Sequence, residues 1–189
     1  ELLARHSPNA LILLVAAALV ASLARGFSGF GGALIFVPLA SAAVGPQAAA
    51  PILLVIDGIA QLALLKNAWR QANRREVGIM AAGALVGIPL GVAILAYVDA
   101  TTLRWAIAVL IVAMLALLIS GWRYHGRPST ATTVGVGFSA GILSGAVQAA
   151  GPPVVAYWLG GNNSALTVRA NIILFFFCTS VVAAISYLA

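Results

Sequence analysis

The chain has 189 residues, of which 62% are hydrophobic and only 7% are charged. So few polar side chains cannot cover the surface of a water-soluble domain, and the composition therefore indicates a protein that is solvated by lipid. The formal net charge of +6 does not indicate a nucleic-acid-binding protein. The basic residues lie in short segments between apolar runs, and no soluble domain remains to carry such a binding surface.

The apolar runs are continuous and rich in Ala and Leu, which favours transmembrane helices over the alternating strands of a β-barrel. A helix needs about 20 apolar residues to cross roughly 30 Å of hydrocarbon. We therefore expect an all-α fold, a polytopic bundle of transmembrane helices. In chain order, the expected apolar segments are residues 10–44, 48–65, 77–98, 103–122, 131–160 and 165–189.

Two basic segments predict the orientation of these helices. Four of the ten Lys and Arg residues lie in a polar loop expected at residues 66–76, and two more lie in a second loop at residues 123–130. Short loops that are rich in Lys and Arg stay cytoplasmic. Two spans separate the loops, so both can face the cytoplasm, and the turn VDATT at residues 98–102 is then expected to face outward.

Two of the apolar segments are interrupted, by GFSGFGG at residues 26–32 and by GAVQAAGPP at residues 145–153. Each glycine costs a helix about 1 kcal/mol relative to alanine, and proline removes an amide donor. Unwound backbone at membrane depth is tolerated where it is buried in protein or lines a wet cavity. The half-helix that follows a break presents its positive N-terminal end, which attracts anions. The alternative is close helix packing through small residues.

A shift of about 119 positions superposes the two interruptions without a gap, placing Gly26 on Gly145 and Gly32 on Gly151. We predict a first transmembrane repeat over residues 9–122 and a second over residues 131–189, truncated at its C-terminal end by roughly fifty residues. Re-entrant hairpins at the breaks would make the repeats inverted, whereas full crossings would make them parallel. The basic Arg169 after the second break favours the inverted arrangement.

Paired breaks at matching positions point to a binding site near the middle of the membrane. Arg25 precedes the first break and Asp57 lies within the next span; they either hold and gate an anion or form a structural ion pair. Asn171 is a second candidate for coupling or gating, although interhelical hydrogen bonding would explain it equally well. The predicted substrate-binding residues are Arg25, Ser28, Gly29, Gly31, Gly32, Gln148, Gly151 and Pro152.

The sequence GFGGALIFVPLA at residues 29–40 resembles the glycine-rich helix in the first half of TauE/SafE proteins, and GAVQAAGPPVVAYWL at residues 145–159 resembles their weaker second repeat. Ala149 and Ala150 stand where that family often has glycine. The resemblance implies about eight spans in two repeats and export of sulfite or an organosulfonate across the bacterial cytoplasmic (inner) membrane. It implies a small-anion substrate and no enzymatic activity, cofactor or metal; the oligomeric state and proton coupling stay open.

Two other functions are alternatives to transport. A non-transporting assembly subunit would give no flux in proteoliposomes. GFSG at residues 26–29 also matches the GxSG pattern of rhomboid intramembrane proteases, which need a histidine base on another membrane helix. His6 and His125, the two histidines of the chain, lie in polar segments outside the predicted spans, so protease activity is disfavoured.

Overall fold

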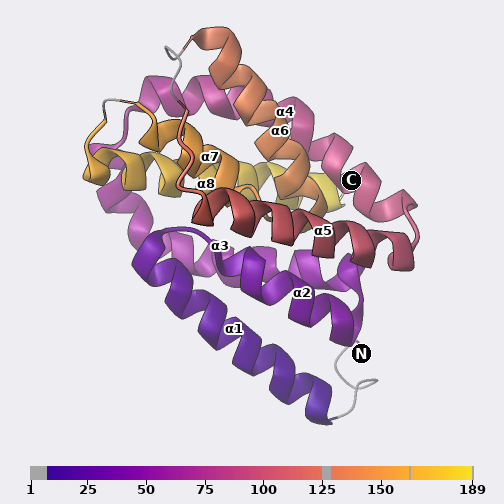
Figure 1. Cartoon of the computed structure of the whole chain (residues 1–189). Helices are drawn as coiled ribbons and strands as arrows, with labels where there is room; N and C mark the ends of the chain where they lie inside the picture. The colour runs from indigo at the N-terminus through magenta and orange to yellow at the C-terminus, as the bar shows by residue number, and fades with distance from the viewer. Residues whose placement is uncertain (1–7, 125–128, 162, 189) are drawn as a thin grey trace.

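The computed structural model describes residues 8–124, 129–161 and 163–188. Eight helices and no strand form this part of the chain, which confirms the predicted all-α fold (Figure 1). Of these, α3, α4, α5, α6 and α8 are long and apolar enough to cross a membrane, whereas α2 and the apolar part of α1, Ile12–Phe27, are shorter. The helices are α1 (Pro8–Ser28), α2 (Gly32–Val44), α3 (Pro46–Gln71), α4 (Arg74–Tyr97), α5 (Ala100–Ile119), α6 (Thr130–Val147), α7 (Gly151–Leu159) and α8 (Ala165–Leu188).

The polar loop expected at residues 66–76 is mostly helical, so this prediction was wrong in its bounds. α3 continues to Gln71, and only Ala72 and Asn73 separate it from α4. Asn73 caps α4: its Oδ1 accepts a hydrogen bond from the Glu76 amide at 3.3 Å, and its Nδ2 donates to Glu76 Oε1 at 2.9 Å. Lys, Arg and Gln are good helix formers, so a basic segment can remain helical. Here the polar segment is interrupted only at Ala72 and at Asn73, the residue that caps the next helix.

The VDATT turn between α4 and α5 has a comparable cap. Asp99 Oδ1 accepts hydrogen bonds from the amides of Thr102 at 2.9 Å and Thr101 at 3.1 Å. The hydrogen bonds from Thr102, supported by the Thr101 amide, hold the pKa of the Asp99 carboxyl below its ordinary value. The carboxylate thus satisfies amides at the positive end of α5, which favours its charged form.

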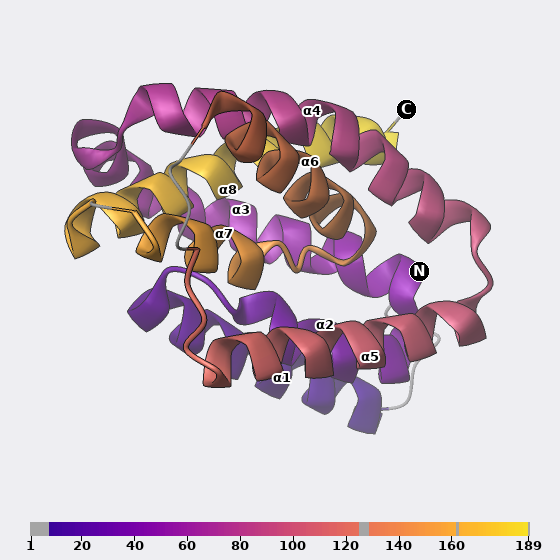
Figure 2. The same ribbon diagram turned by 45° about the horizontal axis from the view of Figure 1, so that its top comes forward.

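The two basic segments lie at the same end of the bundle. The end of α3 and the start of α4, and the end of α5 and the start of α6, gather there, whereas the Asp99 turn lies at the opposite end (Figure 1, Figure 2). Residues 125–128 of the second basic segment lie outside the described residues. This arrangement is the one that the predicted topology requires, although which end faces the cytoplasm stays a prediction.

We expect a cysteine placed at Asn67 to be protected from a membrane-impermeant thiol reagent in intact cells, and a cysteine at Thr101 to be labelled. The positive-inside rule places the basic end of α3 in the cytoplasm and the Asp99 turn outside. Both variants should be labelled after the membrane is permeabilised, which controls for access, and Cys178 replaced by Ala provides the background. Labelling of Asn67→Cys in intact cells would contradict the orientation.

α4 and α6 pack with their backbones in direct contact. They run parallel, because Gly83 lies against Val134 whereas Gly91, two turns later, lies against Ile142 and Ala146. A Cβ atom on Gly87 would lie 2.2 Å from the Phe138 carbonyl oxygen, a distance that no side chain tolerates. The glycines of this contact are Gly83, Gly87 and Gly91 on α4 and Gly137, Gly141 and Gly145 on α6. Small residues at a spacing of four let transmembrane helices approach this closely.

α3 and α8 lie side by side and run in opposite directions (Figure 2). Ala68 near the end of α3 packs with Ala170 and Ile173 near the start of α8. Halfway along both helices, Gln61 Nε2 donates a hydrogen bond to Ser180 Oγ at 3.3 Å, and these residues are 119 positions apart. The first residues of α2 and α7, and of α3 and α8, are separated by the same interval. The interval equals the shift from which the repeats over residues 9–122 and 131–189 were predicted; these repeats, their bounds and their inverted symmetry stay predictions.

Candidate functional site

Both predicted interruptions are breaks between helices. Residues 29–31 separate α1 from α2, and residues 148–150 separate α6 from α7. Gly29 and Gly31 adopt the left-handed backbone conformation that glycine favours, with φ of 83° and 91°. Gln148 adopts it as well, with φ of 57°, although it is not a glycine. For such a residue this conformation costs about 1–2 kcal/mol and persists where the surroundings fix it, as they do at binding sites.

The two breaks meet in the folded chain, although they are more than a hundred positions apart in the sequence. A Cβ atom on Gly151, the first residue of α7, would lie 3.0 Å from the Phe30 ring. A cavity of about 20 Å³ lies between the breaks and receives the first residues of both half-helices. Its lining comprises Arg25, Gly31, Ala33, Leu34, Asp57, Ser144, Gln148, Ala149, Gly151, Pro152, Phe176, Thr179 and Ser180. Pro152 and Pro153 lack amide protons, so α7 presents fewer donors than α2.

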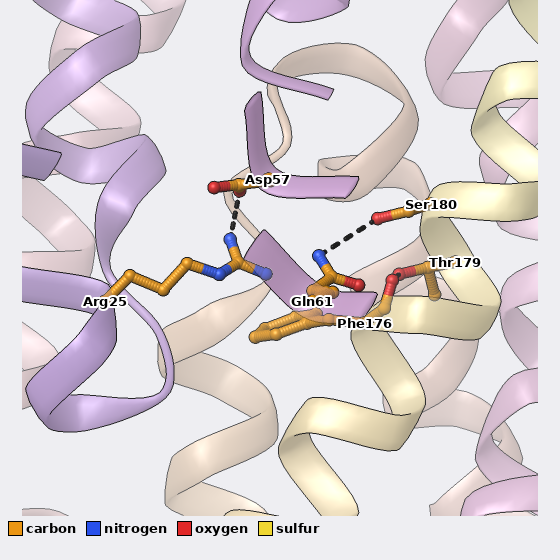
Figure 3. Close-up of polar contacts among 6 residues, drawn as sticks. All are labelled: Arg25, Asp57, Gln61, Phe176, Thr179 and Ser180. Carbon is orange, nitrogen blue, oxygen red and sulfur yellow. Dashed lines mark hydrogen bonds and ion pairs between the residues drawn. The ribbon is translucent and has the colours of Figure 1, made fainter. Parts of the chain in front are cut away.

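A buried ion pair crosses this cavity. Arg25 extends from α1 and donates from Nη1 to the carboxylate of Asp57 on α3 (Figure 3). Only 9% of Arg25 and 5% of Asp57 is exposed. The guanidinium also lies over the ring of Phe176, 5.4 Å from its centroid, which adds a cation–π contact. The sequence left open whether Arg25 and Asp57 form an ion pair or hold an anion. The structure shows the ion pair.

Two amide side chains bring further polar groups to the pair. Gln148 lines the cavity and lies beside the Tyr187 side chain, and its buried Nε2 makes no hydrogen bond of regular geometry among the described residues. Gln61 donates to Ser180, and its buried Oε1 is likewise unpartnered in the described part of the chain (Figure 3). Leaving a buried donor unsatisfied costs about 1–3 kcal/mol. A ligand with oxygen acceptors would relieve that cost at Gln148 Nε2.

The structure gathers most of the predicted site residues. Six of them line the cavity: Arg25, Gly31, Asp57, Gln148, Gly151 and Pro152. Gly29 and Gly32 lie in and directly after the first break, and Ser28 ends α1, although its side chain lies outside the described residues. Asn171 does not line the cavity; its Oδ1 accepts a hydrogen bond from the Asn73 amide at 2.7 Å, in the connection between α3 and α4. Its position therefore gives no support to a coupling role.

The sequence did not predict the other seven residues of the lining, of which four have polar or aromatic side chains: Ser144, Phe176, Thr179 and Ser180. The repeat shift held a signal for three of these four residues. Counted back by 119 positions, Ser144 corresponds to Arg25, Phe176 to Asp57 and Ser180 to Gln61. The counterparts of the charged residues therefore line the same cavity as the charges themselves, although they are not charged.

The cavity holds about one water molecule in this conformation, since one water needs at least roughly 10–15 Å³. An ion with a sulfur atom and three oxygen atoms is larger than that. Binding such an ion therefore requires the surroundings of Arg25 to widen.

Two broken helices that meet beside a buried ion pair, within a bundle of membrane-spanning helices, define a membrane protein of the transporter class. Residues 14–189 match the model of the family described as sulfite exporter TauE/SafE. The chain therefore belongs to the TauE/SafE family, as its resemblance in residues 29–40 and 145–159 predicted. Neither a curated protein nor a solved structure matches it.

Family membership makes the protein a multi-pass membrane exporter of an anion and not an enzyme. The rhomboid-like reading of GFSG thus loses its support. His6 and His125, the histidines that such a protease would need, lie outside the described residues.

Proposed function

We propose that the protein exports a small sulfur-containing oxyanion, sulfite or an organosulfonate, across the bacterial cytoplasmic membrane, through the cavity between the two helix breaks. The single observation that carries this proposal is that one cavity, beside the starts of two half-helices, is lined by a buried guanidinium, Arg25, and by Gln148, whose buried Nε2 makes no hydrogen bond of regular geometry among the described residues. Each of these groups attracts negative charge or oxygen acceptors. No other described residue lining the cavity carries a positive charge.

The site suits a planar or pyramidal oxyanion better than a halide. A guanidinium offers several donors in one fork, which match two oxygen atoms of the same ion. Gln148 Nε2 adds donors from the opposite break, so one oxyanion would join the two halves of the site. The lining also contains hydroxyl groups at Ser144, Thr179 and Ser180, which can donate to a third oxygen.

Proteoliposomes that contain the protein are expected to carry sulfite faster than protein-free liposomes. The comparison should extend to thiosulfate, sulfoacetate, taurine and sulfate, so that the panel ranks the anions. Absence of flux for every anion would instead favour the assembly-subunit alternative.

Gln148→Asn is expected to lower sulfite flux at subsaturating sulfite by about 10-fold or more. Asn also tolerates the left-handed backbone conformation, so the change withdraws the amide donor with little backbone strain. Hydrogen bonds to charged groups contribute about 1.5–3 kcal/mol, which corresponds to that factor. Gln47→Asn, the same change at an exposed position in the first turn of α3, is the matched control. Equal flux in both variants would argue against the cavity as the binding site.

A further inference from the structure

The Asp57 carboxylate pairs with the guanidinium of Arg25, the group that a bound anion would need. Among the described residues that line the cavity, Arg25 and Asp57 carry charge, and they are paired with each other. With room for about one water molecule, the cavity cannot accept an oxyanion while the carboxylate keeps its place. On the proposed function, on which this inference rests, the carboxylate and the transported anion therefore compete for one partner.

If the anion only displaced the Asp57 carboxylate from Arg25, the site would carry an excess of negative charge. A monovalent oxyanion on Arg25 with Asp57 still ionised would place two negative charges beside one positive charge, buried among apolar helices. Buried charges without partners are costly, and such groups become neutral instead. If Asp57 takes up a proton, the site holds one cation, one anion and a neutral acid, so its net charge equals that of the empty, paired site.

We propose that each monovalent oxyanion binds together with one proton, which passes from water to the Asp57 carboxylate as that group releases Arg25. On the other side of the membrane the anion leaves, the proton returns to water and the ion pair forms again. The protein is then a proton-coupled anion carrier. Its transport cycle for a monovalent oxyanion is electroneutral, because one positive and one negative charge cross together.

No other titratable group is placed to substitute for Asp57. Within the described part of the chain, Arg25 is the one charged group that acts on the Asp57 carboxyl. The described parts of α2, α6 and α7 that pack near the cavity carry no Asp, Glu, Lys, Arg, His or Cys. The other titratable residues on the described helices around α3 do not line the cavity; they are Arg104 on α5, Glu76, its two neighbouring arginines and Tyr97 on α4, Tyr157 on α7, and Arg169, Cys178 and Tyr187 on α8. Tyr187 donates its hydroxyl proton to the Gly145 carbonyl at 2.7 Å.

The test counts protons when the anion binds. Calorimetric titration of the detergent-solubilised protein with methanesulfonate, a monoanion at every pH from 5 to 8, is run in two buffers of different ionisation enthalpy. The wild type is expected to take up about one proton per anion at every pH at which Asp57 is ionised in the anion-free protein. In that range its affinity for methanesulfonate falls by about 10-fold for each unit by which the pH rises. Asp57→Asn is expected to bind methanesulfonate without proton uptake and without dependence on pH.

Asp99→Asn is the matched control, because it makes the same change at an exposed cap far from the cavity and should keep the proton uptake of the wild type. Binding by the wild type without proton uptake would overturn the inference, and so would uptake that persists in Asp57→Asn. If Asp57→Asn does not fold, the number of protons that the wild type takes up per anion tests the inference by itself: about one supports it and none overturns it.

Failure of the proposed function has a separate signature. If neither methanesulfonate nor sulfite binds at any pH and no sulfite flux occurs, the transport proposal falls and this inference falls with it. If only sulfite binds, the same count is made with sulfite, and the difference between wild type and Asp57→Asn gives the protons taken up by Asp57. Binding together with flux that responds to membrane potential but not to a proton gradient would overturn the coupling alone.

Discussion

Replacing Arg25 by glutamine is expected to abolish sulfite binding and to destabilise the fold. The change removes the guanidinium from the cavity and leaves the buried Asp57 carboxyl without its partner. Removing one member of a buried ion pair costs about 3–5 kcal/mol. Thermal unfolding in detergent and sulfite titration would measure the two effects separately.

The double variant separates the contribution of Arg25 to folding from its contribution to binding. Arg25→Gln combined with Asp57→Asn replaces the ion pair by two neutral amides, and should recover much of the lost stability but none of the sulfite binding. Asp57→Asn alone should keep binding. Arg104→Gln is the matched control, because the Arg104 side chain donates to the Ser41 carbonyl at 3.2 Å, outside the cavity lining. A double variant that binds sulfite as the wild type does would show that Arg25 serves the fold alone.

Replacing Gly87 by alanine is expected to cost about 3 kcal/mol or more, although the change adds a single methyl group. The new Cβ atom would lie 2.2 Å from the Phe138 carbonyl oxygen and 2.9 Å from the Ile142 nitrogen. Both are backbone atoms, so no side-chain rotation can relieve the overlap and the two helices must separate. Thermal unfolding of the purified variant in detergent would show the loss as a lower transition temperature.

Gly78→Ala is the matched control on the same helix. No atom lies within 4 Å of a Cβ atom built there, and alanine is favoured over glycine in a helix by up to about 1 kcal/mol. This variant should be as stable as the wild type or more so. Similar transition temperatures for Gly87→Ala and Gly78→Ala would show that α4 and α6 are further apart than described.

The positions of the helix breaks could be predicted because glycine and proline alter the backbone directly. Four glycines within residues 26–32 and two prolines within residues 145–153 oppose a continuous helix whatever surrounds them. Arg25 and Asp57 were equally visible, since a charge within an apolar segment needs a partner. These signals depend on local chemistry or on a strong energetic penalty.

The remaining features depend on contacts that local chemistry does not determine. Asn171 looked like a cavity residue, but its helical position turns it toward the Asn73 amide. Thr179 and Ser180 reach the cavity because α8 packs against α3, which no local pattern reveals. Polarity alone predicts a loop from residue 66, whereas α3 continues to Gln71 and the cap at Asn73 starts α4 directly afterwards. The size of the cavity follows from the packing of several helices at once.

The close contact of α4 with α6 has a consequence for how the cavity can widen. Backbones that touch along a row of glycines cannot tilt or slide against each other without overlap, so α4 and α6 form a rigid frame. α6 leads into one break and is held by that frame, whereas α2 follows Gly29 and Gly31, two residues without side chains to restrict rotation. We therefore expect residues 29–31 to act as the hinge, and α2 to swing away from Arg25 while the side of the cavity formed by α6 stays in place.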